Sequence, residues 1–148
     1  MTIETTANKV SFSGDGSTTV FTFPYLYLDG GHVKVVRVDG SGVETQLSKD
    51  ADYTVAAAGD PNGGAVTLAT APGVGESVVI HRQVDLTQAS DYGAASNVRL
   101  ADIESDLDRL VMMAQQLEEE LSRSLKVRIS SQSTNIEFPE PDTTKVLG

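Results

Sequence analysis

Two histidines, His32 and His81, are the residues of this chain best suited to acid–base or metal chemistry. An imidazole acts as a general base or a metal ligand only when a hydroxyl, a carboxylate or further ligands stand close to it. Each histidine lies at the edge of an apolar β run, no further ligand follows at metal-binding spacing, and no G-x-S-x-G motif is nearby. We therefore expect both to be surface or hydrogen-bonded strand residues, without a catalytic role.

Phosphate and calcium binding are poorly supported by the turn sequences. The Gly14-Asp15-Gly16 turn precedes a predicted strand, whereas a glycine-rich phosphate cradle needs a helix N-terminus after it. Aspartate is common in turns because its carboxylate accepts hydrogen bonds from nearby backbone N–H groups, and no D-x-[DN]-x-[DN]-G loop is present. Such turn aspartates are Asp29, Asp39, Asp50, Asp52 and Asp60. The sequence predicts no cofactor and no metal ion.

A further set of carboxylates lies in a predicted helix near the C-terminal end. Its members are Asp102, Glu104, Asp106, Asp108 and Glu118 to Glu120. Paired acids hydrolyse glycosides only inside a concave, preorganised site, which one exposed helix does not supply. We expect these acids to form a solvated helix face, and we expect no enzyme activity.

Charge and composition argue against several classes of binding partner. The 148 residues include 11 Lys and Arg against 21 Asp and Glu, a formal net charge of −10. Phosphate contacts need Lys and Arg, so the balance argues against nucleic acid and against an anionic membrane surface. Cysteine is absent, which excludes disulfides and thiolate metal sites. No apolar stretch reaches the roughly 18 residues of a membrane span, and the N-terminus does not resemble a secretion signal.

The elements that carry these residues change type along the chain. Residues 1–90 alternate short apolar runs with Gly, Pro, Asn and Asp turns at intervals of about 8–12 residues, a spacing typical of a small sandwich or barrel. The predicted strands are Val10–Phe12, Val20–Phe23, His32–Val38, Val43–Leu47, Asp52–Val55, Ala65–Ala69 and Ser77–Val84, with a hairpin across Asp39–Gly42. The fold class is therefore mostly β: a small antiparallel β-sandwich or barrel followed by a long α-helix that forms a trimeric coiled-coil stem.

The second part of the chain is predicted to be a linker, a helix and a tail. The polar segment Asp85–Asn97 ends in a linker at 91–97, and Ser96 or Asn97 suits a helix N-cap. Helix formers then run without Gly or Pro over 98–126. Residues 127–148 are predicted to add one strand, up to Glu137, and then a Pro-spaced linker that leads to a distal part beyond Gly148.

The predicted helix carries a regular apolar stripe. Its members are Leu100, Ile103, Leu107, Leu110, Ala114, Leu117 and Leu121. The steps alternate between three and four residues, and a repeat of 3.5 is buried by supercoiling against other helices. Val111, Met112 and Met113 widen the apolar face, which suits three helices or packing on a β domain. We expect a homotrimer through this stripe; the alternative is a helix that lies across its own β domain. Ala114 weakens the seam.

Five stretches between Val10 and Glu120 follow one another in a specific order: VSFSGDGSTTVFTFPY, VKVVRVDGSG, DYTV, SVVIHRQVDLTQ and GAASNVRLADIESDLDRL. Their order and spacing resemble the N-terminal, virion-anchoring domain of tail fibre and tailspike proteins from short-tailed phages. The closing FPEPDTTKVLG resembles the Pro-spaced joint that often follows in phage fibres. The resemblance implies a non-catalytic structural protein of the virion tail that anchors a trimeric fibre on tail tube, adaptor or nozzle proteins after synthesis in the host cytoplasm.

Two other functions remain open on sequence grounds. A carbohydrate-binding β-sandwich would need aromatic side chains on an exposed face, and the chain has no Trp and only Tyr25, Tyr27, Tyr53 and Tyr92 as tyrosines. A glycan depolymerase would need a carboxylate or Ser/His constellation, which the sequence does not provide. Either the chain continues beyond Gly148 into the receptor-binding part, as its abrupt KVLG end favours, or it is an adaptor on which another spike docks.

Overall fold

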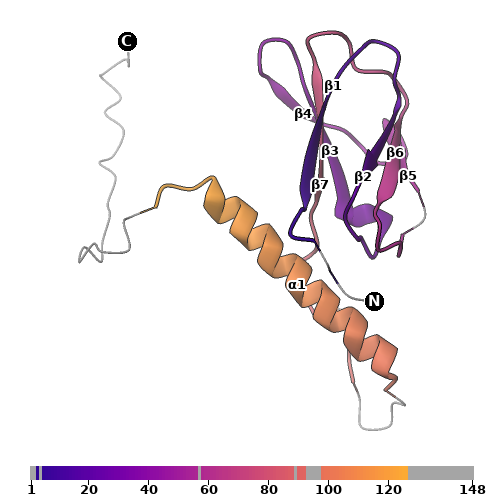
Figure 1. Cartoon of the computed structure of the whole chain (residues 1–148), viewed down its shortest axis with the longest axis vertical. Helices are drawn as coiled ribbons and strands as arrows, with labels where there is room; N and C mark the ends of the chain where they lie inside the picture. Colours follow the sequence, from indigo (N-terminus) through magenta and orange to yellow (C-terminus); the bar gives the residue numbers. More distant parts are fainter. Residues whose placement is uncertain (1–2, 4, 57, 89, 93–97, 127–148) are drawn as a thin grey trace.

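The computed structural model describes residues 3, 5–56, 58–88, 90–92 and 98–126. Two antiparallel β-sheets form a sandwich, and one long helix lies across one end of it (Figure 1). The prediction of a mostly β chain with a sandwich followed by a helix is confirmed. The strand expected up to Glu137 and the linker after it lie outside the described residues.

The larger sheet has the strand order β1-β7-β3-β4, and each neighbouring pair is antiparallel. Its strands are β1 (Lys9–Ser13), β3 (Val33–Val38), β4 (Glu44–Gln46) and β7 (Ser77–Arg82). In the central strand β7, Val78, Ile80 and Arg82 are buried and alternate with half-buried residues, as the twofold period of a strand requires. The predicted hairpin of β3 and β4 across Asp39–Gly42 is confirmed.

The smaller sheet has the order β2-β6-β5 and is also antiparallel. Its strands are β2 (Val20–Phe23), β5 (Tyr53–Val55) and β6 (Gly64–Leu68). Phe21 and Phe23 point inward from β2, which ends before Pro24 because proline has no N–H for the ladder. A short 3₁₀ helix, η1 (Gly30–His32), leads into β3.

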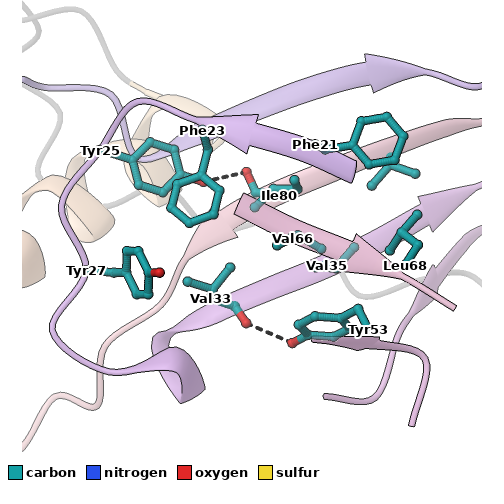
Figure 2. Packing of buried hydrophobic residues seen from close by; sticks show 11 residues of the cluster. Phe21, Phe23, Tyr25, Tyr27, Val33, Val35, Tyr53, Val66, Leu68 and Ile80 are labelled. Atoms are coloured by element: carbon teal, nitrogen blue, oxygen red, sulfur yellow. Dashed lines mark hydrogen bonds between the residues drawn. The ribbon is translucent and has the colours of Figure 1, made fainter. Parts of the chain in front are cut away.

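Aromatic side chains fill the space between the sheets (Figure 2). The ring of Phe23 lies 4.8 Å from that of Tyr25 and 5.2 Å from that of Tyr27, measured between centroids. Three buried phenols find backbone acceptors: Tyr25 donates to the carbonyl of Ile80 at 2.9 Å, Tyr27 to that of Ala56 at 2.8 Å and Tyr53 to that of Val33 at 2.8 Å. Each of these hydrogen bonds removes the cost of an unpaired hydroxyl, and those of Tyr25 and Tyr53 join a loop or strand to the facing sheet.

The helix α1 (Leu100–Ser122) is shorter than the predicted 98–126. Its N-cap is Arg99, so the prediction of Ser96 or Asn97 as the cap is wrong. The Asp102 carboxylate accepts a hydrogen bond from the Arg99 backbone N–H at 3.3 Å, as an acid at the third helical position does in a capping box.

Candidate interaction surface on helix α1

The inner face of α1 packs on the end of the sandwich through a second, smaller core. Met112 is fully buried against Leu26 and Val84, with Ile3 and Met113 at the margin of the cluster. Leu26 belongs to the segment after β2, and Val84 follows β7. The helix therefore closes the end of the sandwich where these two segments leave the sheets (Figure 1).

Buried polar side chains fix the helix on this end of the sandwich. Arg82, the last residue of β7, donates from Nη1 to the Leu26 carbonyl at 2.6 Å and from Nη2 to Oε1 of Gln115. Its guanidinium lies 5.7 Å from the Tyr25 ring centre, a cation–π distance. Burial lowers the pKa of Arg82 from its ordinary value. In this buried position the guanidinium is stabilised by the two carbonyl oxygens that it binds and by the face of the Tyr25 ring.

The N-terminal segment forms a further layer beside the helix. Asn8 Nδ2 donates to the Gln115 carbonyl at 3.1 Å, and Gln115 Nε2 donates to the Thr5 carbonyl at 2.9 Å. Lys9 pairs with Glu119, which also binds Arg123. Hydrogen bonds from Arg123 and Lys9 lower the Glu119 pKa to about 2. The start of β1 is thus tied to the last turns of α1.

The expectation of a solvated acidic face is wrong for Asp108, which is 7% exposed on the inner face. Burial raises its pKa, although a hydrogen bond from the Ile3 backbone N–H opposes that shift. Asp106 accepts hydrogen bonds from Ser90 Oγ, at 2.8 Å, and from the Tyr92 hydroxyl. These acids hold neighbouring segments against the helix.

The outer face of α1 carries the predicted stripe, and most of it is exposed. Exposed large members are Leu100, Ile103, Leu107, Leu110, Leu117 and Leu121. At about 100° per residue, this stripe and the buried row Asp108, Met112 and Gln116 lie about 180° apart. The alternative, a helix that packs its stripe on its own β domain, is therefore correct about the position of the helix but not about the face that packs. The sandwich covers the opposite side of α1 and leaves the stripe exposed.

The two histidines lie on or beside the larger sheet near α1: His32 shares a pocket with Asp106 and Arg109, and His81 shares another with Gln116 and Glu119. His81 pairs with Lys9 and Lys34 across β1 and β3, and burial lowers its pKa. Burial also lowers the pKa of His32, a half-buried residue of η1 whose Nδ1 atom is buried without a hydrogen-bond partner. No group of three or more potential metal ligands occurs among the described residues.

Most of the turn aspartates accept hydrogen bonds from backbone N–H groups within their own turns. Asp15 accepts from the backbone N–H groups of Ser17 and Thr18, at 2.8 and 2.7 Å, and these hydrogen bonds lower its pKa. Asp39 accepts from the backbone N–H groups of Ser41 and Val43 in the β3–β4 hairpin. Of the aspartates for which local hydrogen bonds were expected, Asp29, Asp52 and Asp60 likewise accept from backbone N–H groups of their own turns, whereas Asp50 pairs with Lys49.

The tyrosines do not form a sugar-stacking face. Tyr25, Tyr27 and Tyr53 are buried in the core, and Tyr92 is exposed. Three of the four tyrosines on which the carbohydrate-binding alternative depends are therefore used for packing between the sheets (Figure 2).

Sequence reasoning found the outer stripe but missed Arg82, Asp108 and Gln116. Their signal was weak: Asp108, Met112 and Gln116 follow at steps of four, which marks one helix face, but polar residues there are usually solvated.

A small β-sandwich that holds a long helix and exposes its apolar stripe has the architecture of an assembly module. Comparison with known proteins agrees, since the family "Phage T7 tail fibre protein, N-terminal domain" matches residues 2–132. The chain belongs to this family and is a structural component of a phage tail. It is also 30% identical over 126 residues to the tail spike protein of Salmonella phage epsilon15, covering 85% of this chain and 12% of that relative. No described helix has the length and apolarity to cross a membrane.

Proposed function

We propose that this chain anchors a host-recognition fibre or spike on the phage tail, as a homotrimer joined through α1. The observation that carries the proposal is the exposed stripe, which lies opposite the face that packs on the sandwich. An apolar patch of this kind, rimmed by polar residues, indicates an interaction surface, and its 3.5-residue repeat suits other helices of the same type. The sandwich would then stand outside the coil without blocking the seam.

The charges beside the stripe favour a parallel arrangement of the copies. With Leu100 at heptad position a, the acids at the flanking e and g positions are Glu104, Asp106, Glu118 and Glu120. An antiparallel arrangement places e beside e and g beside g, so these acids would repel one another. In a parallel arrangement, position g of one copy lies beside the following e of its neighbour, which brings Arg99 to Glu104.

Attachment through three copies needs no single strong site. Three sandwiches held together bind a tail surface with an effective concentration that raises their apparent affinity. The partners we propose are tail tube, adaptor or nozzle proteins; the net charge of −10 disfavours nucleic acid and membrane. This role requires no catalysis by the chain, which is made in the host cytoplasm and assembled into the virion.

Light scattering of the purified chain over a dilution series tests the trimer. We expect a mass close to three chains, and a shift to one chain in a Leu110→Glu/Leu117→Glu variant. Ala101→Glu adds a charge to an exposed helix position outside the stripe and should leave the mass unchanged. A single-chain mass for the unmodified protein at every concentration would overturn the homotrimer.

A further inference from the structure

A groove of about 400 Å³ lies beside the stripe, between α1 and the segment that leads from β7 toward the helix. Its apolar walls are Leu86 and Tyr92 on one side and Leu110 and Met113 on the other, with Asp106 at the edge. The Tyr92 hydroxyl donates to the Asp106 carboxylate, which fixes the aromatic wall on the helix.

The walls of the groove continue the apolar surface of the stripe. Leu110 belongs to both, and Leu86 in the groove is 58% exposed. Apolar area that remains in water costs about 25 cal/mol per Å², so a side chain that filled the groove would be stabilised. Such a contact would add apolar area to the helix–helix interface, where Ala114 at the centre of the stripe contributes little.

Val111 is an apolar side chain of fitting size that is 44% exposed. It lies on the other flank of α1, about 150° around the helix from the groove. In a parallel coil, the residue at g lies beside the following e residue of the neighbouring helix. That relation places Val111 of one copy beside Asp106 of the next, at the edge of the neighbour's groove.

We propose that the groove receives Val111 of a neighbouring copy, so that Leu86 and Tyr92 join the stripe in the contact between copies. The inference rests on the parallel homotrimer proposed above and adds a defined contact to it. The trimer interface then includes a segment outside the helix, which would lock the three sandwiches at a fixed angle around the stem.

Cysteine cross-linking tests this contact directly, because the chain contains no cysteine of its own. A Leu86→Cys chain and a Val111→Cys chain carrying different tags are coexpressed, purified through both tags and oxidised. A disulfide between the two tagged chains can form only between copies. We expect efficient cross-linking for this pair. Val43→Cys paired with Val111→Cys is the matched control, since Val43 is 59% exposed in the β3–β4 hairpin, and it should not cross-link.

The outcomes separate the contact from the trimer. A single-chain mass in light scattering would overturn both. A trimeric mass without the Leu86–Val111 cross-link, or with equal cross-linking of the Val43 control, would overturn the groove contact alone. Sedimentation equilibrium gives a second readout without cysteines. We expect Leu86→Ser and Val111→Ser each to weaken association about tenfold, and the double variant to lose less than the product of the two. Strictly independent losses would contradict a direct contact.

Discussion

The Oε1 atom of Gln116 accepts a hydrogen bond from the backbone N–H of Val84 at 2.9 Å, and both residues are buried. Val84 follows the last strand, and Gln116 lies on the inner face of α1. The bond connects a fixed point of the sandwich to one angular position on the helix. It therefore helps to set the rotation of α1 about its axis, and with it the outward direction of the stripe.

Replacing Gln116 by Ala should lower the free energy of unfolding by about 1–3 kcal/mol, because the Val84 N–H would lose its partner in a buried place. Urea unfolding in the Leu110→Glu background, at a dilution where light scattering gives the mass of one chain, measures this without the contribution of association. Leu117→Ala is the matched control on the opposite face, and it should change the unfolding free energy of the monomer by less than about 0.5 kcal/mol. Equal losses for the two variants would contradict the assignment of the two faces.

Arg82 makes a second prediction about the same contact between helix and sandwich. Arg82→Lys keeps the charge but loses the planar fork that reaches both the Leu26 carbonyl and Gln115. We expect the free energy of unfolding to fall by about 2–3 kcal/mol, the usual cost of losing a hydrogen bond to a buried charge. Urea unfolding of the monomeric background gives the value.

Arg123→Lys is the control for this prediction, because Arg123 is exposed at the end of α1. Its replacement should cost no more than about 0.5 kcal/mol. If Arg82→Lys were as mild as the control, the guanidinium would not be the group that holds the helix on the sandwich.

The strands were predictable from the sequence because their signals are local. Alternation in Ser77–Val84 and the glycine turn at Asp39–Gly42 each depend on neighbouring residues, and both reappear in the structure. The orientation of α1 was not predictable, because its inner face is built from polar residues whose partners lie far away in the chain. Asp108 meets the backbone of Ile3, and Gln116 meets that of Val84. Periodicity identified the stripe, but it cannot tell which face a sandwich will cover.

Glu119 should contribute a stability that depends on pH. Its pKa falls from the ordinary 4.5 to about 2 because it binds Arg123 and Lys9, so its charged form is favoured by folding. This contribution is complete above pH 4.5 and is lost as the pH falls from 4.5 to about 2. The side chain of Glu119 is 20% exposed, so water screens the pairs and we expect about 1 kcal/mol.

The measurement is the difference in unfolding free energy between the protein and Glu119→Gln at several pH values. The difference should be present at pH 6 and shrink below pH 4.5. Glu118→Gln, at an exposed neighbouring position, is the matched control for the removal of a helix carboxylate. A Glu119 difference that stays constant down to pH 2 would show that its carboxylate is not stabilised by the fold.

Two glycines with positive φ allow the cost of backbone strain to be distinguished from the cost of a steric clash. Gly16 has φ 79° with open space around it, whereas Gly63 has φ 108° and a Cβ there would stand 1.8 Å from the Phe23 carbonyl oxygen. Gly16→Ala should therefore cost only the strain of a left-handed residue, about 1–2 kcal/mol. Gly63→Ala must also push β2 away from β6, so we expect a loss above about 3 kcal/mol or failure to fold. Thermal unfolding of both variants compares them, and equal melting temperatures would show that β2 does not press on this turn.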